Sequence, residues 1–252
     1  MCQWQGGLAT SGRLALPPAC SIAKVVAMGF IVRNATPLDV AALEALNHAA
    51  YPDLLAAGVV YEARQLQEQI AAFGPGQRVV EEGGRIVGAI STLIVAEQDA
   101  LAPHTWIDIT DCGRFRTHNP CADVLYLADI YVHPDSRGRG VGAVLYGALR
   151  DLCRANGLRR IVGGGRLWSY HEFAQTMTPE AYVGAVQSGF LYDAVLSSQL
   201  RQGFQVRRVM PAYLDDWRSG GFATLIDWPN QVLISAQAAN RARDGAPLQH
   251  HP

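Results

Sequence analysis

The sequence has no excess of charge, few cysteines and no unbroken apolar run that could span a membrane. Its 252 residues carry 21 Lys and Arg against 22 Asp and Glu, so it lacks the basic surplus typical of nucleic-acid-binding proteins. Its five cysteines are irregularly spaced and odd in number, which disfavours a disulfide framework and favours a reducing, cytoplasmic setting. The longest apolar stretch, residues 14–32, is broken by Pro17, Pro18 and Lys24, which argues against a transmembrane helix.

The hydrophobic pattern predicts one domain between two flexible ends. Residues 1–28 are rich in Gly, Ala, Ser and Pro without a clear period, which predicts a flexible N-terminal extension rather than a signal peptide. Residues 235–252 lose hydrophobic periodicity and are expected to form a flexible tail. The remaining residues, 29–234, are enough for a single α/β domain.

Within this domain the periodicity predicts strands and helices in mixed order. The expected strands are residues 29–33, 77–82, 85–96, 124–132, 160–163, 204–209 and 223–228. The expected helices begin at Pro37 and Thr178, cover 61–73 and 193–202, and run from about 141 to 155. Residues 124–132 form a continuous apolar run, which predicts a strand at the centre of the sheet.

Residues 97–123 follow neither the helical nor the strand period. A segment of this length without a pattern predicts a loop that is either functional or disordered. It contains Cys112, His118 and Cys121, with His104 upstream, but their spacing matches no compact zinc module. We therefore predict no metal site.

A glycine-rich turn separates the central strand from an amphipathic helix. The turn, residues 133–142, has the sequence HPDSRGRGVG, with a glycine at every second position from 138 to 142. Glycine lets the backbone approach a ligand closely, and the N-terminus of the next helix adds about half a positive charge. Arg137 and Arg139 add mobile positive charge, so the turn is suited to binding a pyrophosphate.

Two other phosphate-binding patterns do not fit this turn. A P-loop requires GxxxxGK[ST], and the sequence contains no such run. A Rossmann GxGxxG pattern has Ala143 at its third position, which that pattern tolerates. However, the turn follows a meander past the midpoint of the chain, and Arg159 and Arg160 stand where an acidic residue is needed.

Arg-x-x-Gly-x-Gly at residues 137–142, between a long strand and a helix, resembles the GNAT superfamily of acyl-CoA N-acyltransferases. The resemblance extends from about Met28 to Asn230 and includes the stretch VHPDSRGRGVGAVLYGAL and the order of the expected elements. Residues 163–230 are similar to the acetyltransferase domain that elsewhere is fused in front of a carbon–nitrogen hydrolase, which implies a stand-alone version here. The implied α/β fold is a mixed, mostly antiparallel central sheet flanked by helices.

The resemblance also implies acetyl-CoA as cosubstrate and a set of residues that binds it. The backbone N–H groups of the turn would hold the pyrophosphate. The end of the preceding strand would splay open and hydrogen-bond the pantetheine arm as another strand would. The implied residues are Ile130, Tyr131, Val132, Arg137, Gly138, Arg139, Gly140, Val141 and Gly142.

Asp129 is a candidate general base within the apolar strand. Transfer to an alkylamine requires the neutral amine, and removing the proton at pH 7 costs roughly 4–5 kcal/mol at a pKa of about 10.4. Asp129 stands where family members often place a glutamate base, and an aspartate in an apolar strand invites a raised pKa. A structural carboxylate that caps a neighbouring loop is the alternative interpretation.

The usual general acid of the family has no counterpart in this sequence. The family often has a tyrosine four residues before the glycine that ends the penultimate helix, and here that position is Gln199. Glutamine cannot usefully donate a proton, so Tyr192, Tyr170 and His171 become the candidates, and each has an alternative role in packing or substrate contact.

These observations predict an N-acyltransferase that moves an acetyl group from acetyl-CoA to a primary amine of a small molecule or peptide. Residues 97–123 and 167–177 are expected to form the acceptor pocket. Exposed edge strands and the frequent dimers of the family resembled predict a homodimer. The balanced charge and the broken apolar stretch predict neither nucleic acid nor membrane as a partner. The alternative is a non-catalytic acyl-CoA sensor or scaffold, which the missing tyrosine favours and Asp129 disfavours.

Overall fold

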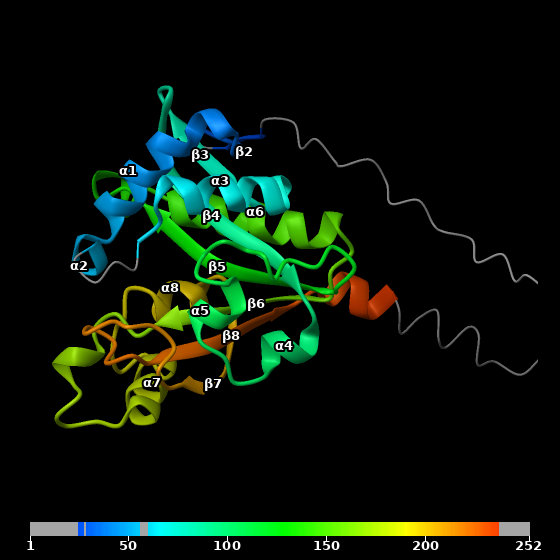
Figure 1. The fold of residues 1–252 in the computed structure, drawn as a ribbon. Helices are drawn as coiled ribbons and strands as arrows, with labels where there is room; N and C mark the ends of the chain where they lie inside the picture. Colours follow the sequence, from blue (N-terminus) through cyan, green and yellow to red (C-terminus); the bar gives the residue numbers. More distant parts are fainter. Residues whose placement is uncertain (1–24, 28, 56–59, 237–252) are drawn as a thin grey trace, which may run out of the picture.

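The computed structural model describes residues 25–27, 29–55 and 60–236 (Figure 1). Of the extension expected over residues 1–28, the described part, Val25–Ala27, forms strand β1. Of the tail expected over 235–252, residues 235 and 236 end a helical segment that begins at residue 231. The rest of both predicted ends lies outside the described residues.

The described residues form one eight-stranded sheet in the order β1-β2-β3-β4-β5-β6-β8-β7. Only the β5–β6 pairing within it is parallel, which confirms a mixed and mostly antiparallel sheet. Residues 124–132 lie at its centre, as their apolar run predicts (Figure 1). The strands are β1 Val25–Ala27, β2 Phe30–Asn34, β3 Arg78–Glu82, β4 Arg85–Val95, β5 Val124–Val132, β6 Arg160–Arg166, β7 Gln205–Met210 and β8 Ala223–Pro229.

Helices cover both faces of the sheet. α6 packs on one face through Leu145, Leu149 and neighbouring residues, which contact apolar side chains of β2 to β6. α1 and α3 cover the other face over β3 to β5, α4 and α5 continue that layer, and α7 packs near β7. The helices are α1 Val40–Ala50, α2 Pro52–Leu55, α3 Ala63–Phe73, α4 Glu97–Leu101, α5 Trp106–Thr110, α6 Val141–Ala155, α7 Pro179–Gln187 and α8 Leu196–Arg201.

Residues 97–123 differ from the predicted loop because they contain two short helices. α5 is fixed by a capping box, in which the Asp108 backbone N–H donates to the Thr105 hydroxyl at 3.1 Å. The backbone N–H of Trp106 donates to the carbonyl of Tyr213 at 2.9 Å, which ties α5 to the β7–β8 connection. Helices this short show little periodicity, so tertiary contacts rather than pattern define them.

The two central strands separate halfway along their length. β5 and β6 pair from Val124 with Arg160 to Leu127 with Gly163, and their described pairing ends there. A register irregularity in the β4–β5 pairing coincides with this point, between Ser91 and Thr92. The second half of β5 therefore lies beside an opening in the sheet rather than beside a neighbouring strand.

Candidate active site

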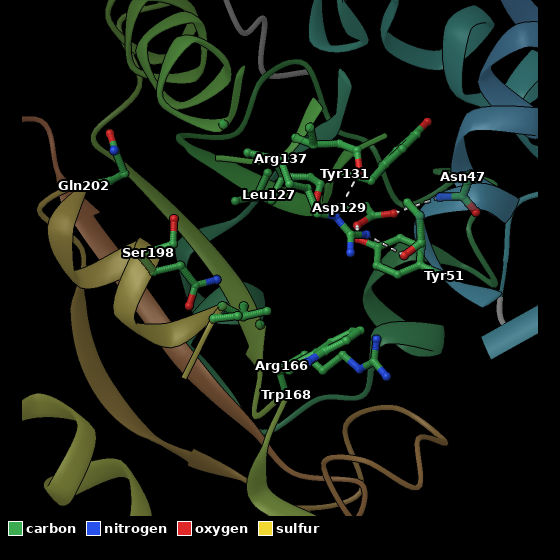
Figure 2. Close-up of a pocket in the computed structure, with 18 of the residues that line it drawn as sticks. Asn47, Tyr51, Leu127, Asp129, Tyr131, Arg137, Arg166, Trp168, Ser198 and Gln202 are labelled. Atoms are coloured by element: carbon green, nitrogen blue, oxygen red, sulfur yellow. Dashed lines mark hydrogen bonds between the residues drawn. The ribbon is translucent and has the colours of Figure 1, made fainter. Parts of the chain in front are cut away.

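A cavity of about 600 Å³ occupies the opening between β5 and β6 (Figure 2). The second half of β5 forms one wall, α1 and Tyr51 a second, α8 a third, and the glycine turn before α6 closes one end. Trp106 and Trp168 also line it, so each of the two segments predicted for the acceptor pocket contributes a residue. The cavity thus collects side chains from both halves of the sheet.

The glycine turn has the backbone conformation that its sequence predicts. Gly138 and Gly140 have φ angles of 74° and 92°, a left-handed region that side chains with a Cβ rarely adopt. Gly140 is the N-cap of α6, so its conformation aims the first free N–H groups of the helix toward the cavity end. The turn is therefore a preformed anion-binding element.

The residues implied in CoA binding divide into two groups. Most of them line the cavity, while Arg139 and Val141 are not among the lining residues. Arg139 instead makes an exposed ion pair with Glu82, and the Val141 side chain is buried against the sheet. The lining members are Ile130, Tyr131, Val132, Arg137, Gly138, Gly140 and Gly142.

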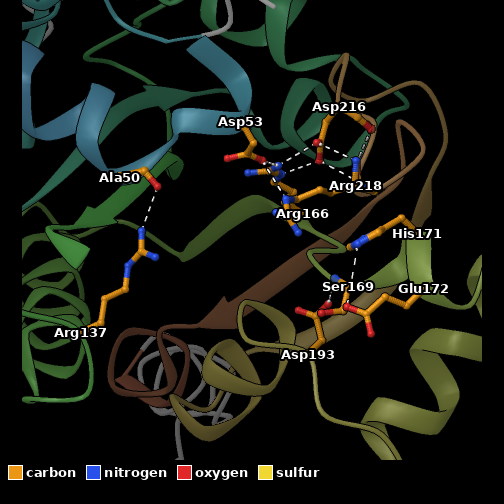
Figure 3. Close-up of polar contacts among 11 residues, drawn as sticks. Ala50, Asp53, Arg137, Arg166, Ser169, His171, Glu172, Asp193, Asp216 and Arg218 are labelled. Carbon is orange, nitrogen blue, oxygen red and sulfur yellow. Dashed lines mark hydrogen bonds and ion pairs between the residues drawn. The ribbon is translucent and has the colours of Figure 1, made fainter. Parts of the chain in front are cut away.

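Arg137 connects the turn to helix α1. Its Nη2 donates to the carbonyl of Ala50, the last residue of α1, at 2.9 Å (Figure 3). A cation near the C-terminus of a helix is favourable because the last carbonyls carry partial negative charge. This contact holds the arginine at the cavity beside the glycine backbone.

Asp129 lies in the cavity with two hydrogen-bond donors from the α1 region. The Tyr51 hydroxyl donates to Oδ1 at 2.6 Å, and Asn47 Nδ2 donates to Oδ2 at 3.2 Å (Figure 2). The Tyr51 hydroxyl also lies 3.1 Å from the carbonyl of Ile130. A further hydrogen bond fixes the orientation of the Asn47 amide, because its Oδ1 accepts from the backbone N–H of Tyr61 at 2.9 Å.

Burial raises the pKa of Asp129 to about 6. The hydrogen bonds from Tyr51 and Asn47, together with the charge of Arg166, act in the opposite direction and stabilise the carboxylate. A carboxyl group with this pKa is largely ionised at neutral pH and still basic enough to accept a proton. Asp129 is therefore a carboxylate in the cavity whose pKa lies close to neutral pH.

The structure separates the two tyrosines predicted as general acids. Tyr192 lines the cavity at its rim, and its side chain is largely exposed. Tyr170 does not belong to the cavity lining; its hydroxyl donates to the carbonyl of Met177 at 3.0 Å, and its ring packs against Tyr182. The structure therefore does not bring Tyr170 to the cavity, because packing directs its hydroxyl toward Met177.

Gln199 occupies the position where the family often has a tyrosine. Its side chain is buried, lines the cavity and packs against Gly165, where a Cβ would overlap its amide. Gly165 and Gln199 therefore fit each other sterically. A proton donor must come from elsewhere in the lining, since an amide does not supply one.

A network of charged side chains on the far side of the opening was not predicted. Arg166, at the end of β6, pairs with Asp53 of α2 and with Asp216 of the β7–β8 connection (Figure 3). Its guanidinium also lies 4.7 Å from the ring centre of Trp168. The network joins the two halves of the molecule across the opening, and its members are more than 40 residues apart in sequence, so no local pattern predicts it.

The described residues contain no group of three His, Cys, Asp or Glu side chains that could hold a metal ion. Cys112 and Cys121 are exposed, whereas Cys153 is buried in α6.

Within the same described part of the chain, no helix has both the length and the apolar character needed to cross a bilayer.

Comparisons with known proteins define the class. A family model described as the acetyltransferase (GNAT) family matches residues 41–165, a stretch that includes Asp129 and the glycine turn. The chain is 33% identical over 199 residues to the uncharacterized N-acetyltransferase YkwB of Bacillus subtilis, covering 79% of this chain and 88% of YkwB. The chain therefore belongs to the GNAT acetyltransferase family, as its sequence motif predicts.

A second relative agrees with the resemblance to a domain associated with a hydrolase. The chain is 34% identical over 220 residues to the probable hydrolase YhcX of Bacillus subtilis, covering 87% of this chain. It spans 42% of YhcX, less than half of that protein's length.

Two solved structures share the fold over nearly their whole length. The GphF GNAT-like decarboxylase in complex with isobutyryl-CoA has a TM-score of 0.70 and 25% identity, covering 79% of this chain and 98% of its own. The loading GNATL domain of CurA from Lyngbya majuscula has a TM-score of 0.69 and 20% identity, and the match covers 81% of this chain and 98% of the CurA domain. Both similarities confirm the GNAT fold.

Proposed function

We propose that the chain is an N-acyltransferase that moves an acetyl group from acetyl-CoA to a primary amine of a small molecule or peptide. The observation that carries this proposal is Asp129, a partly buried carboxylate with a pKa raised to about 6 inside the cavity. It lies on the strand that leads directly into the glycine turn, so one continuous segment supplies both a base and an anion-binding element.

The cavity fits an acyl-CoA by its chemistry. Gly138 and Gly140 present backbone N–H groups and the N-terminus of α6 to a pyrophosphate. The half of β5 that follows Leu127 has no described strand partner on its β6 side, so backbone groups of Ile130 and Val132 are expected to pair with the pantetheine amides. On this proposal the thioester would lie near the point where β5 and β6 separate.

Asp129 is proposed to accept the proton of the attacking amine, directly or through one water. The amine nitrogen forms a bond to the thioester carbonyl carbon, and the carbon–sulfur bond then breaks to release the CoA thiolate, which takes up a proton. Tyr51 and Asn47 hold both carboxylate oxygens of Asp129, so the base is oriented before the substrates bind. Tyr192 remains a proposed acid at the cavity rim.

The direct test is release of free thiol from acetyl-CoA in the presence of a panel of primary amines, with calorimetry of CoA binding in parallel. Amine-dependent thiol release supports the proposal. CoA binding without thiol release from any amine would instead favour the non-catalytic sensor or scaffold.

A second candidate activity is decarboxylation of a carboxylated acyl-CoA. The similarity to the GphF GNAT-like decarboxylase, at 25% identity and a TM-score of 0.70, favours it. Gln199 in place of the usual tyrosine also favours it, because decarboxylation breaks a carbon–carbon bond and leaves the thioester intact, so no thiolate has to be protonated. Malonyl-CoA therefore separates the two activities: carbon dioxide without free thiol indicates decarboxylation, whereas amine-dependent thiol from acetyl-CoA indicates transfer.

We also propose that the protein is a cytoplasmic homodimer. β1 and β7 are the edges of the described sheet, and exposed edges are often covered by self-association. Light scattering at micromolar concentration should give about twice the chain mass of 27.2 kDa, and a value near the chain mass would contradict the dimer.

A further inference from the structure

Three side chains form a continuous line of hydrogen bonds from the cavity toward the protein surface. The hydroxyl of Tyr213, which lines the cavity, lies 2.9 Å from the hydroxyl of Tyr126. The Tyr126 hydroxyl lies 2.8 Å from Nε2 of His104. His104 belongs to the segment between α4 and α5 and is only half-buried, so the line ends at a group that reaches solvent.

The inner end of this line lies where β5 and β6 separate. The last described β5–β6 pair joins Leu127 to Gly163, and the next residue, Gly164, packs against the ring and hydroxyl of Tyr213. A Cβ at residue 164 would overlap that ring, so glycine is needed there for Tyr213 to enter the opening. The hydroxyl of Tyr213 is therefore at the place where the proposed function puts the thioester.

The outer end of the line fixes its direction. Nδ1 of His104 lies 2.8 Å from the carbonyl oxygen of Ala102, and a carbonyl can only accept a hydrogen bond. Neutral His104 therefore carries its proton on Nδ1, and its Nε2 must accept from Tyr126. Tyr126 in turn accepts from Tyr213, so both hydroxyl protons point outward and an oxygen lone pair of Tyr213 is left for the cavity.

The environment of His104 favours this neutral form. Burial lowers the pKa of His104, and the charge of Arg208 acts in the same direction, while Asp108 and a backbone contact at Asp99 oppose it. Arg208 also donates to the carbonyls of Leu101 and Ala102, which fixes the hydrogen-bond acceptor of His104. The imidazole is thus neutral before the proton arrives, and its Nε2 is the acceptor that faces Tyr126.

Acyl transfer to an amine requires an outlet for one proton. An alkylammonium and an acyl thioester give an amide, a free thiol and one proton. Substrates that fill the cavity displace water from it, so a path through side chains provides an outlet for the proton taken from the amine. From this geometry we propose that Tyr213, Tyr126 and His104 are a side-chain relay that carries this proton from the cavity to the surface.

The relay rests on the proposed transfer reaction and adds three residues to it. A proton that reaches the Tyr213 oxygen displaces the hydroxyl proton toward Tyr126, whose own proton passes to Nε2 of His104. The imidazolium then releases its Nδ1 proton to solvent, and rotation of the two hydroxyls with exchange of the imidazole proton restores the starting arrangement; only O–H and N–H bonds change. Burial raises the pKa of Tyr213, and the charge of Asp129 adds to that rise, so Asp129 acts electrostatically on the inner end of the relay. On this proposal Asp129 takes the proton from the amine, and the relay then carries it to the surface.

Tyr126→Phe tests the relay at its middle link. The variant keeps the ring that packs in the core and removes only the hydroxyl, and Tyr126 is not among the residues that line the cavity. We expect kcat to fall about 10- to 100-fold, within the range of proton-transfer catalysis, with unchanged affinity for CoA. The matched control is Tyr182→Phe, which also removes a buried hydroxyl but one bonded to Asp193, outside the relay.

Two further measurements distinguish proton transfer from structural damage. The double variant with Tyr213→Phe and Tyr126→Phe should have a kcat no lower than that of the less active single variant, because both substitutions interrupt the same path. Imidazole in the buffer should restore the kcat of His104→Ala, because the side chain lost in that variant lies near solvent, and should not restore the kcat of Tyr126→Phe. Equal recovery of kcat in both variants, or recovery in neither, overturns the relay.

The relay and the proposed function fail in different ways. If Tyr126→Phe retains kcat within twofold of Tyr182→Phe while Asp129→Asn is inactive, the relay is wrong and the transfer reaction stands. If the wild-type protein releases no thiol with any amine, the transfer reaction itself is wrong.

Discussion

The halves of the molecule on either side of the opening contribute to the cavity in different ways. The half from β1 to β5, with α1 and α6, supplies backbone N–H groups, a carboxylate and its two donors. The half from β6 to β8 supplies bulky side chains held by an ion network, chiefly Arg166 with Asp53 and Asp216. On the proposed function, the first half would bind the parts that every acyl-CoA shares, and the second half would contact the acceptor.

The largest effect is expected at the contact between the halves. Arg166→Ala leaves Asp53 and Asp216, whose side chains are 10% and 0% exposed, without their main cation. Removal of one partner from a buried ion pair costs about 3–5 kcal/mol, so the free energy of unfolding should fall by that amount. Denaturant titration measures it.

Arg159→Ala is the matched control, because its pairs with Glu97 and Asp123 are largely exposed and should contribute less than about 1 kcal/mol. An equal loss of stability in both arginine variants would mean that the network does not join the halves.

The next effect concerns the base in the first half. Asp129→Asn keeps the shape of the side chain and removes its basicity, so kcat should fall by about 100-fold or more with little change in CoA affinity. Steady-state kinetics and calorimetry measure both. Asp151→Asn, at an exposed carboxylate on α6, serves as the control.

The pH dependence sharpens this prediction. Below about pH 6 Asp129 becomes protonated and can no longer accept a proton, so kcat/KM of the wild-type enzyme should decline as the pH falls through that value. The residual activity of Asp129→Asn should lack this limb. A variant that melts early but keeps the limb would assign the base to another group.

A smaller effect is expected in the glycine turn. Gly142 has an ordinary helical φ and open space around a built Cβ, so Gly142→Val tests ligand approach without the strain that Gly140 would suffer at a φ of 92°. Affinity for CoA should fall about tenfold, near 1.4 kcal/mol. Gly147→Val on the same helix, also in open space but outside the cavity lining, is the control.

The smallest effect is expected at Tyr51. Its hydrogen bond stabilises the ionised form of Asp129, so Tyr51→Phe should raise the pKa of Asp129 and move the acidic limb to higher pH. Since a hydrogen bond to a charged group contributes roughly 1.5 kcal/mol, its loss should shift the pKa of Asp129, and with it the acidic limb, by roughly one pH unit. A limb that moves to lower pH would contradict the assigned donor.

The first half was largely predictable from sequence because its key parts are local. β5 and α6 have the predicted bounds, and the turn between them was identified from one continuous segment. Asp129 could be placed because it lies on that strand. Its donors could not, since Tyr51 and Asn47 are about 80 residues away in sequence.

The sequence by itself determined most strands and helices and the glycine turn, because hydrophobic pattern, glycine conformation and helix capping depend on near neighbours. Its resemblance to the GNAT superfamily supplied the fold class and the candidate base. Only the tertiary structure decided that Tyr170 packs away from the site, and that residues 97–123 form two helices. It alone also joined His104 to Tyr126 and Tyr213, and Arg166 to Asp53 and Asp216. These contacts link segments far apart in the chain. Hydrogen bonds and ion pairs over such separations produce no periodic pattern in the sequence from which they could be predicted.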